Sequence, residues 1–341
     1  MPDPIDITPY HWAGFIVIVL LFLALDLGVF HRRAHVVGFR EALVWTVVWF
    51  SLAMVFTFSF VKPNMGEKKA VLFITGYITE LSLSMDNVFV IALIFGYFRI
   101  PPEYQHRVLF WGILGALIMR GLMILVGVGL IDRFQWILYF FGLFLVYTGV
   151  KMLFTEEEGV HPEKNPVIRL ARKLYPVTSG FHGQKLFIRE EGRSALTPLA
   201  IVLLMVETTD LVFAVDSIPA IFGLTTDPFV VFTSNIFAIL GLRSLYFVLA
   251  GAIGYFRYLK IGLSVVLLFI GVKMLLDPHE HEGTDAVSNK FWFQVEIEPH
   301  ISLTVVVSII LTSIVFSLIV ARRERPAASK AGKNDDEAES P

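Results

Sequence analysis

The 341-residue chain contains no cysteine. Without thiols it can form no disulfide framework, no iron–sulfur cluster and no thiolate site for a soft metal. Any metal that it binds must therefore be held by oxygen or nitrogen atoms. Charged residues are also scarce, at 17% of the chain against 55% hydrophobic residues, and this balance excludes an ordinary soluble domain.

Three further absences exclude classes of function: a nucleotide-binding loop, a catalytic nucleophile and a strong net charge. The glycine-rich segment 121–129 lies inside an apolar run of membrane-spanning length, so it is no nucleotide loop, and we expect no coupling to ATP hydrolysis. No serine nucleophile is paired with a histidine inside such a run, which argues against a hydrolase. We expect no enzyme activity and no permanently bound cofactor. The net charge of −2 gives no indication of nucleic-acid binding.

Apolar runs of membrane-spanning length dominate what is present. They predict an all-α, polytopic membrane protein with nine transmembrane helices in a single domain, residues 1–321, whose first partner is the lipid bilayer. The predicted spans are 12–30, 41–61, 69–98, 106–131, 134–154, 195–222, 228–254, 257–276 and 301–321.

Lysine and arginine concentrate in alternate connections between these spans. Because positively charged loops remain in the cytoplasm, we expect the N-terminus outside and the C-terminus inside. Residues 155–194 are then a cytoplasmic loop. Residues 322–341, rich in polar and charged side chains, are expected to form a disordered cytoplasmic tail.

Two segments of the chain repeat each other. Each carries an acid, five residues and then aspartate: Glu80 to Asp86 and Asp210 to Asp216. Downstream, Arg120 corresponds to Arg243, and the sequence GVKML occurs at both 149–153 and 271–275. The repeats 69–154 and 195–276 each hold three spans, an odd number, so the second must enter the membrane from the opposite side. This predicts an inverted repeat, with spans 12–30, 41–61 and 301–321 peripheral.

Acids inside hydrocarbon are costly, and they indicate a functional site. By depth, Glu80 and Asp216 form an outer tier, and Asp86 and Asp210 an inner tier that Glu207 joins. We therefore expect partners within each tier. Six residues turn a helix through about 600°, so the two acids of one repeat do not share a face unless the helix is irregular.

The polar residues around these acids form a set of hard oxygen ligands, suited to Mg²⁺, Ca²⁺ or Mn²⁺. Pro219 cannot donate a hydrogen bond to the Val215 carbonyl, which becomes a candidate ligand. Two histidines in an acidic outer loop, His279 and His281, are weaker candidates for metal capture. The further polar candidates are Asn87, Ser84, Ser217, Asn235 and Asp26. For Asn235 the alternative role is helix–helix hydrogen bonding. For Asp26 it is pairing with a nearby arginine.

Arg120 and Arg243 lie well inside their spans, where an arginine is costly unless it meets an acid. We expect both to pair with the five acids. One interpretation is structural: the pairs lock the helices together. The other is functional: the arginines hold the acids until a metal binds. The sequence leaves both open.

Three segments resemble the signature segments of the TerC family: residues 24–33 (ALDLGVFHRR), 80–90 (ELSLSMDNVFV) and 207–223 (ETTDLVFAVDSIPAIFG). Its better-understood members, the Alx-like proteins, are similar to manganese exporters with a LysE-superfamily fold. The resemblance implies a bacterial inner-membrane protein with Mn²⁺ as its transported substrate. It also implies that Asp86, Asn87 and Asp216 lie on the transport route.

Two functions from different classes follow. The first is a secondary exporter of a divalent metal ion driven by an ion gradient, with protons as the expected coupling ion. The second is a membrane interaction protein that serves tellurite or envelope-stress resistance, or metallation of exported proteins, without transport. The sequence leaves open whether copies associate into a homo-oligomer.

Overall fold

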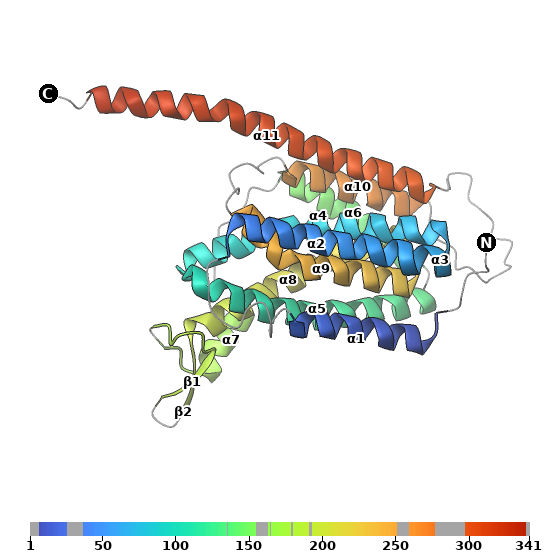
Figure 1. Cartoon of the computed structure of the whole chain (residues 1–341), viewed down its shortest axis with the longest axis horizontal. Helices are drawn as coiled ribbons and strands as arrows, with labels where there is room; N and C mark the ends of the chain where they lie inside the picture. Colours follow the sequence, from blue (N-terminus) through green and yellow to red (C-terminus); the bar gives the residue numbers. More distant parts are fainter. Residues whose placement is uncertain are drawn as a thin grey trace.

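The computed structural model describes residues 7–25, 37–134, 136–154, 163, 165–178, 180–190, 193–250, 259–276 and 297–338. Long helices run side by side to form a bundle (Figure 1). Its helices are α1 (Pro9–Leu25), α2 (Phe39–Phe56), a π-helical turn η2 (Thr57–Val61), α3 (Lys62–Met65), α4 (Glu67–Tyr97), α5 (Pro102–Arg133), α6 (Ile137–Phe154), α7 (Pro166–Leu174), α8 (Pro198–Phe222), α9 (Pro228–Ala250), α10 (Leu259–Leu276) and α11 (Pro299–Ala338).

Eight helices of the described chain are long and apolar enough to cross a membrane, with α2, η2 and α3 forming one continuous span, Phe39–Met65. The prediction of an all-α polytopic membrane protein is confirmed. The remaining predicted span, 12–30, corresponds to α1, which has 17 residues, and residues 26–30 of that span lie outside the described residues. The count of nine therefore stays a prediction.

Helix α6 and helix α10 approach so closely that glycine is needed at the contact. A Cβ atom added to Gly271 would lie 2.9 Å from the Gly142 carbonyl oxygen, and one added to Gly149 would lie 2.9 Å from the Ser264 carbonyl oxygen. The two contacts are equivalent under the sequence repeat: Gly271 corresponds to Gly149 and Ser264 to Gly142, each at a separation of 122 residues (271 − 149 = 122 and 264 − 142 = 122). Such reciprocity is what two antiparallel repeats around a two-fold axis require.

Helices α4 and α8, which carry the repeated acids, cross antiparallel in the centre of the bundle. Gly76 near the start of α4 lies against Ile221 at the end of α8, whereas Asn87, later in α4, contacts Asp210, earlier in α8. Helix α9 packs beside α4 and is buried over nearly all of its length. The acids of both repeats are thereby placed near one crossing point.

The structure differs from the sequence-based prediction outside the spans. The predicted loop 155–194 contains α7 and strand β1 (Phe187–Glu190), which pairs antiparallel with β2 (Arg193–Leu196). The predicted disordered tail is helical as far as Ala338, because α11 continues out of the membrane-spanning segment. Residues 322–338 include four alanines, three arginines, two lysines and two glutamates. Adding such helix formers to an existing helix costs little. Figure 1 shows this extension, α7 and the hairpin at the same end of the bundle.

Candidate functional site

A buried arginine joins three helices at the centre of the bundle. Arg120 of α5 is 1% exposed and forms ion pairs with Glu80 of α4 and Asp210 of α8. Its Nη2 and Nε atoms donate to the two carboxylate oxygens of Asp210 at 2.9 and 3.2 Å, a bidentate arrangement. Arg120 was expected to pair with the acids inside the spans, and it contacts two of them.

Neighbouring polar groups complete this cluster. Asn235 of α9 donates to Glu80 Oε2 at 3.0 Å, and Ser84 donates to Glu80 Oε1 at 3.2 Å. Asn87 donates to Asp210 Oδ1 at 3.1 Å, and the Ser217 hydroxyl accepts from Arg120 Nη1 at 3.3 Å. All four carboxylate oxygens of Glu80 and Asp210 are therefore hydrogen-bonded, as buried charges require.

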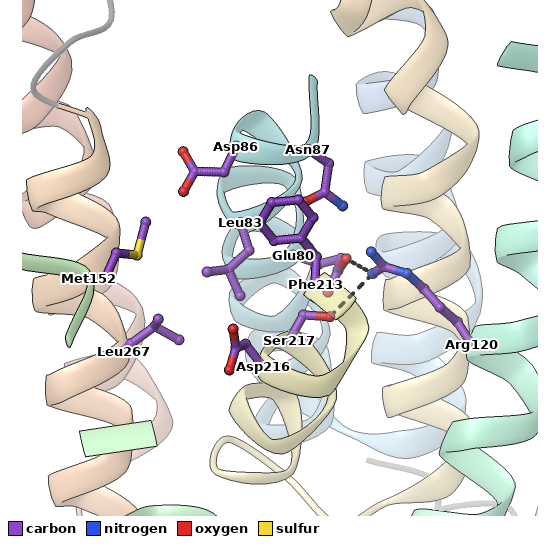
Figure 2. Close-up of a pocket in the computed structure, with 10 residues that line it drawn as sticks. All are labelled: Glu80, Leu83, Asp86, Asn87, Arg120, Met152, Phe213, Asp216, Ser217 and Leu267. Carbon is purple, nitrogen blue, oxygen red and sulfur yellow. Dashed lines mark hydrogen bonds and ion pairs between the residues drawn. The ribbon is translucent and has the colours of Figure 1, made fainter. Parts of the chain in front are cut away.

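A cavity of about 50 Å³ lies beside the Arg120 cluster. Figure 2 shows Asp86 and Asp216 pointing away from Arg120, toward Met152 of α6 and Leu267 of α10. The volume exceeds what one water molecule needs. The lining residues are Glu80, Leu83, Asp86, Asn87, Arg120, Met152, Phe213, Asp216, Ser217 and Leu267.

Helix α6 supplies a hydrogen bond and an electrostatic interaction to Asp216 that the sequence-based prediction missed. Thr148 donates to Asp216 Oδ1 at 3.1 Å, and Lys151, about one turn further along α6, interacts electrostatically with the same carboxylate. The available signal was the repeated GVKML sequence, which places Lys151 and Lys273 inside apolar spans. Lys273 is only 1% exposed.

A model of the Integral membrane protein TerC family matches residues 65–325. This chain belongs to the TerC family. The match includes every span that contributes to the Arg120 cluster and to the cavity.

Relatives in bacteria support the same assignment. An uncharacterized membrane protein of Myxococcus xanthus is 50% identical over 326 residues, which covers 96% of this chain and 97% of the relative. An Escherichia coli K12 protein described as "Putative membrane-bound redox modulator Alx" is 46% identical over 282 residues, 80% of this chain and 88% of the relative. An uncharacterized membrane protein of Rickettsia bellii is 38% identical over 308 residues, 90% and 97% of the two chains. No solved structure matches.

The predicted partnerships within depth tiers differ from the ion pairs of this TerC-family protein. The prediction joined Glu80 with Asp216 and Asp86 with Asp210. Arg120 joins Glu80 with Asp210 across the two tiers, while Glu80 and Asp216 line one cavity. Depth is not the cause, because Asn87 does lie level with Asp210. The cause is helix rotation: six residues turn the chain about 600°, which leaves the side chains about 120° apart, so Asp86 and Asp216 lie on another face of their helices than Glu80 and Asp210.

Of the remaining candidate residues, those that the structure describes are not among the residues that line the cavity. The Glu207 carboxylate packs directly on Gly115 of α5 and is half-buried. Val215 has a side chain that is 45% exposed, and α8 continues as a helix through Pro219, so no break there directs its carbonyl into the cavity. Arg243 is buried on α9. Asp26, His279 and His281 lie outside the described residues.

The donor atoms at the cavity are a mixed oxygen set. Among the residues that the structure describes, no three histidine, aspartate or glutamate side chains come close enough together to hold a metal ion by themselves. Asn87 Oδ1 is buried and makes no hydrogen bond to any described group. A cation next to Asp86 or Asp216 would thus take part of its coordination from amide, hydroxyl or water oxygens, which suit hard cations.

Proposed function

We propose that this TerC-family protein is a secondary transporter that exports a hard divalent cation through the cavity between α4 and α8. The observation that carries the proposal is the placement of Asp86 and Asp216 at a membrane-embedded cavity beside the Arg120 cluster. Ionisable groups at this depth are retained where ions or protons pass. Mn²⁺ is the proposed substrate because the three signature segments resemble those of the TerC family, whose Alx-like members are similar to manganese exporters.

The charge balance of the site supports a divalent substrate. Four acids belong to the cavity and its adjoining cluster, Glu80, Asp86, Asp210 and Asp216. Two cations interact with them: Arg120 through ion pairs, and Lys151 electrostatically. Counted in their ionised forms, they sum to −4 + 2 = −2. One divalent cation neutralises this charge, and so do two protons. We therefore infer exchange of one metal ion for two protons at the same acids.

Arg120 has a different role in this scheme from the acids that face the cavity. Its bidentate bond to Asp210 and its bond to Glu80 satisfy both carboxylates without a metal. We infer that Arg120 fixes α4, α5 and α8 in this arrangement, while Asp86 and Asp216 receive the incoming cation. Asn87 belongs both to the Arg120 cluster and to the cavity. Its amide nitrogen donates to Asp210, while its Oδ1 atom makes no hydrogen bond to the described residues.

We further infer an inner-membrane location with the C-terminus in the cytoplasm. The support is the concentration of lysine and arginine in alternate connections, which remain on the cytoplasmic side. The end of α11 lies at the same end of the bundle as α7 and the hairpin, as that orientation requires (Figure 1).

Transport is tested by manganese flux into liposomes that contain the purified protein and a manganese-sensitive dye. We expect the wild-type protein to admit Mn²⁺ faster than empty vesicles, and Asp86→Ala to return the rate to that of empty vesicles. A wild-type rate equal to the empty-vesicle rate would reject transport. If the protein still bound Mn²⁺, that result would favour the interaction protein, which binds metal without moving it.

A further inference from the structure

Helix α7 has an exposed apolar face beside a basic face. Ile168 is fully buried against the bundle, whereas Val167, Leu170 and Leu174 are 39%, 56% and 64% exposed. At 100° per residue these three exposed apolar side chains lie within an arc of about 60°. The exposed basic residues of the same helix, which fill a neighbouring arc of about 100°, are Arg169, Arg172 and Lys173.

A hydrogen bond fixes the position of α7 relative to a membrane-spanning helix. Asn165 caps α7 by accepting from the backbone N–H groups of Val167 and Ile168 at 3.0 and 3.3 Å. Its Nδ2 atom donates to Thr208 Oγ1 of α8 at 2.8 Å. Thus the start of α7 lies beside residue 208, ten positions after the first residue of α8.

This position places α7 at the level of the bilayer. Helix α8 has 25 residues, and about 20 are enough to cross the hydrocarbon, so at most about five lie outside it at its start. Even then, Thr208 would lie about 7 Å inside the hydrocarbon boundary. At that depth, the exposed side chains of Leu170 and Leu174 would face lipid rather than bulk water.

We propose that α7 is an interfacial helix whose apolar arc inserts into the lipid leaflet and whose basic arc binds anionic lipid headgroups. Surface helices with a narrow apolar face and a flanking basic face bind membranes through both parts. Lysine and arginine near a membrane surface add electrostatic attraction to anionic lipids. The inference concerns the position of α7 and does not depend on the transport proposed above.

The same contacts connect the lipid-facing helix to the site. Thr208 follows Glu207 directly and lies two residues before Asp210, which binds Arg120. Asn165 bonds to Thr208 with its side chain while capping α7. Any displacement of α7 in the leaflet would therefore act on the segment of α8 that carries the inner acids.

The absence of cysteine makes a direct test simple, because one introduced cysteine is a unique labelling site. Full-length Leu170→Cys and Arg169→Cys would be nitroxide-labelled and reconstituted in vesicles of phosphatidylcholine and phosphatidylglycerol. We expect the label at 170 to be relaxed by lipid-soluble oxygen and shielded from a water-soluble paramagnetic reagent, and the label at 169 to show the opposite order. Equal exposure of both labels to the aqueous reagent would overturn insertion and indicate a face for a soluble partner.

The headgroup part of the proposal has its own measurement. We expect omission of phosphatidylglycerol to raise the aqueous accessibility of the label at 170. The combined Arg169→Gln and Lys173→Gln substitutions should give this higher accessibility in both kinds of vesicle. An unchanged signal at 170 with and without phosphatidylglycerol would reject headgroup binding. Size-exclusion profiles matching the wild type establish that these surface variants are folded.

Discussion

Arg120 is expected to be the residue on which stability depends most. It is buried with two carboxylates, and removing one member of such a cluster leaves uncompensated charge, at a cost of about 3–5 kcal/mol. We expect Arg120→Ala to lower the thermal unfolding temperature and the folded yield in detergent. Arg120→Lys should recover part of the loss, since lysine restores the charge but not the bidentate geometry.

Leu122→Ala, two residues along α5, is the matched control. The Leu122 side chain is 62% exposed on the outer surface of the bundle, so its truncation removes little packing within the protein. Its unfolding temperature should stay near that of the wild type. If Arg120→Ala and Leu122→Ala unfolded at the same temperature, the buried ion pairs would not be the stabilising element.

The acids on the two sides of α4 and α8 should behave differently. Asp210→Asn removes a charge that accepts two bonds from Arg120, so we expect a lower unfolding temperature. Asp86→Asn, which changes a half-buried acid pointing away from Arg120, should leave that temperature nearly unchanged (Figure 2). Thermal unfolding of the two purified variants tests this difference. An equal decrease in unfolding temperature in both would contradict it.

At the scale of the residue, the sequence was sufficient to find the acids and to pair Arg120 with them, because charge in hydrocarbon is visible in any sequence. It was not sufficient to choose the partners. Depth follows from topology, but the direction of Asp86 relative to Glu80 depends on helix rotation and on the crossing of α4 and α8. Thr148 was missed because a lone threonine in an apolar run is usual.

Among the elements, the contact of α6 with α10 depends on glycine. A Cβ atom at Gly271 would press on the backbone oxygen of Gly142, and neither backbone can move without separating the helices. We therefore expect Gly271→Ala to lower the unfolding temperature. Gly129→Ala in α5 is the control, because no atom lies within 4 Å of its added Cβ and alanine favours a helix. An equal or higher unfolding temperature for Gly271→Ala would show that the close approach is not needed.

The helices themselves were largely predictable, since runs of apolar residues long enough to span a membrane have few alternative structures. The connections were not. The Asn-Pro sequence at 165–166 resembles the start of a helix, yet the hydrogen bond from Asn165 to Thr208 joins segments 43 residues apart and has no local signal. The helical extension of α11 was missed because composition alone favoured disorder.

For the whole molecule, the expected topology can be tested with a membrane-impermeant thiol reagent. His182→Cys lies in the segment between α7 and β1, and Lys68→Cys lies at the opposite end of the bundle, at the start of α4; both positions are exposed. With a cytoplasmic hairpin, the reagent should label position 68 in spheroplasts and position 182 only in inverted vesicles. Labelling of position 182 in spheroplasts would reverse the orientation.

The measurement closest to the central claim records manganese and protons together. Proteoliposomes containing a manganese-sensitive and a pH-sensitive dye would be compared for the wild type, Asp86→Asn, Asp216→Asn and the control Leu122→Ala. We expect about two protons to move against each Mn²⁺ in the wild type and the control, in keeping with the net charge of −2 at the site, and neither ion to move in the two acid variants. Manganese flux that persists in both acid variants would contradict the account.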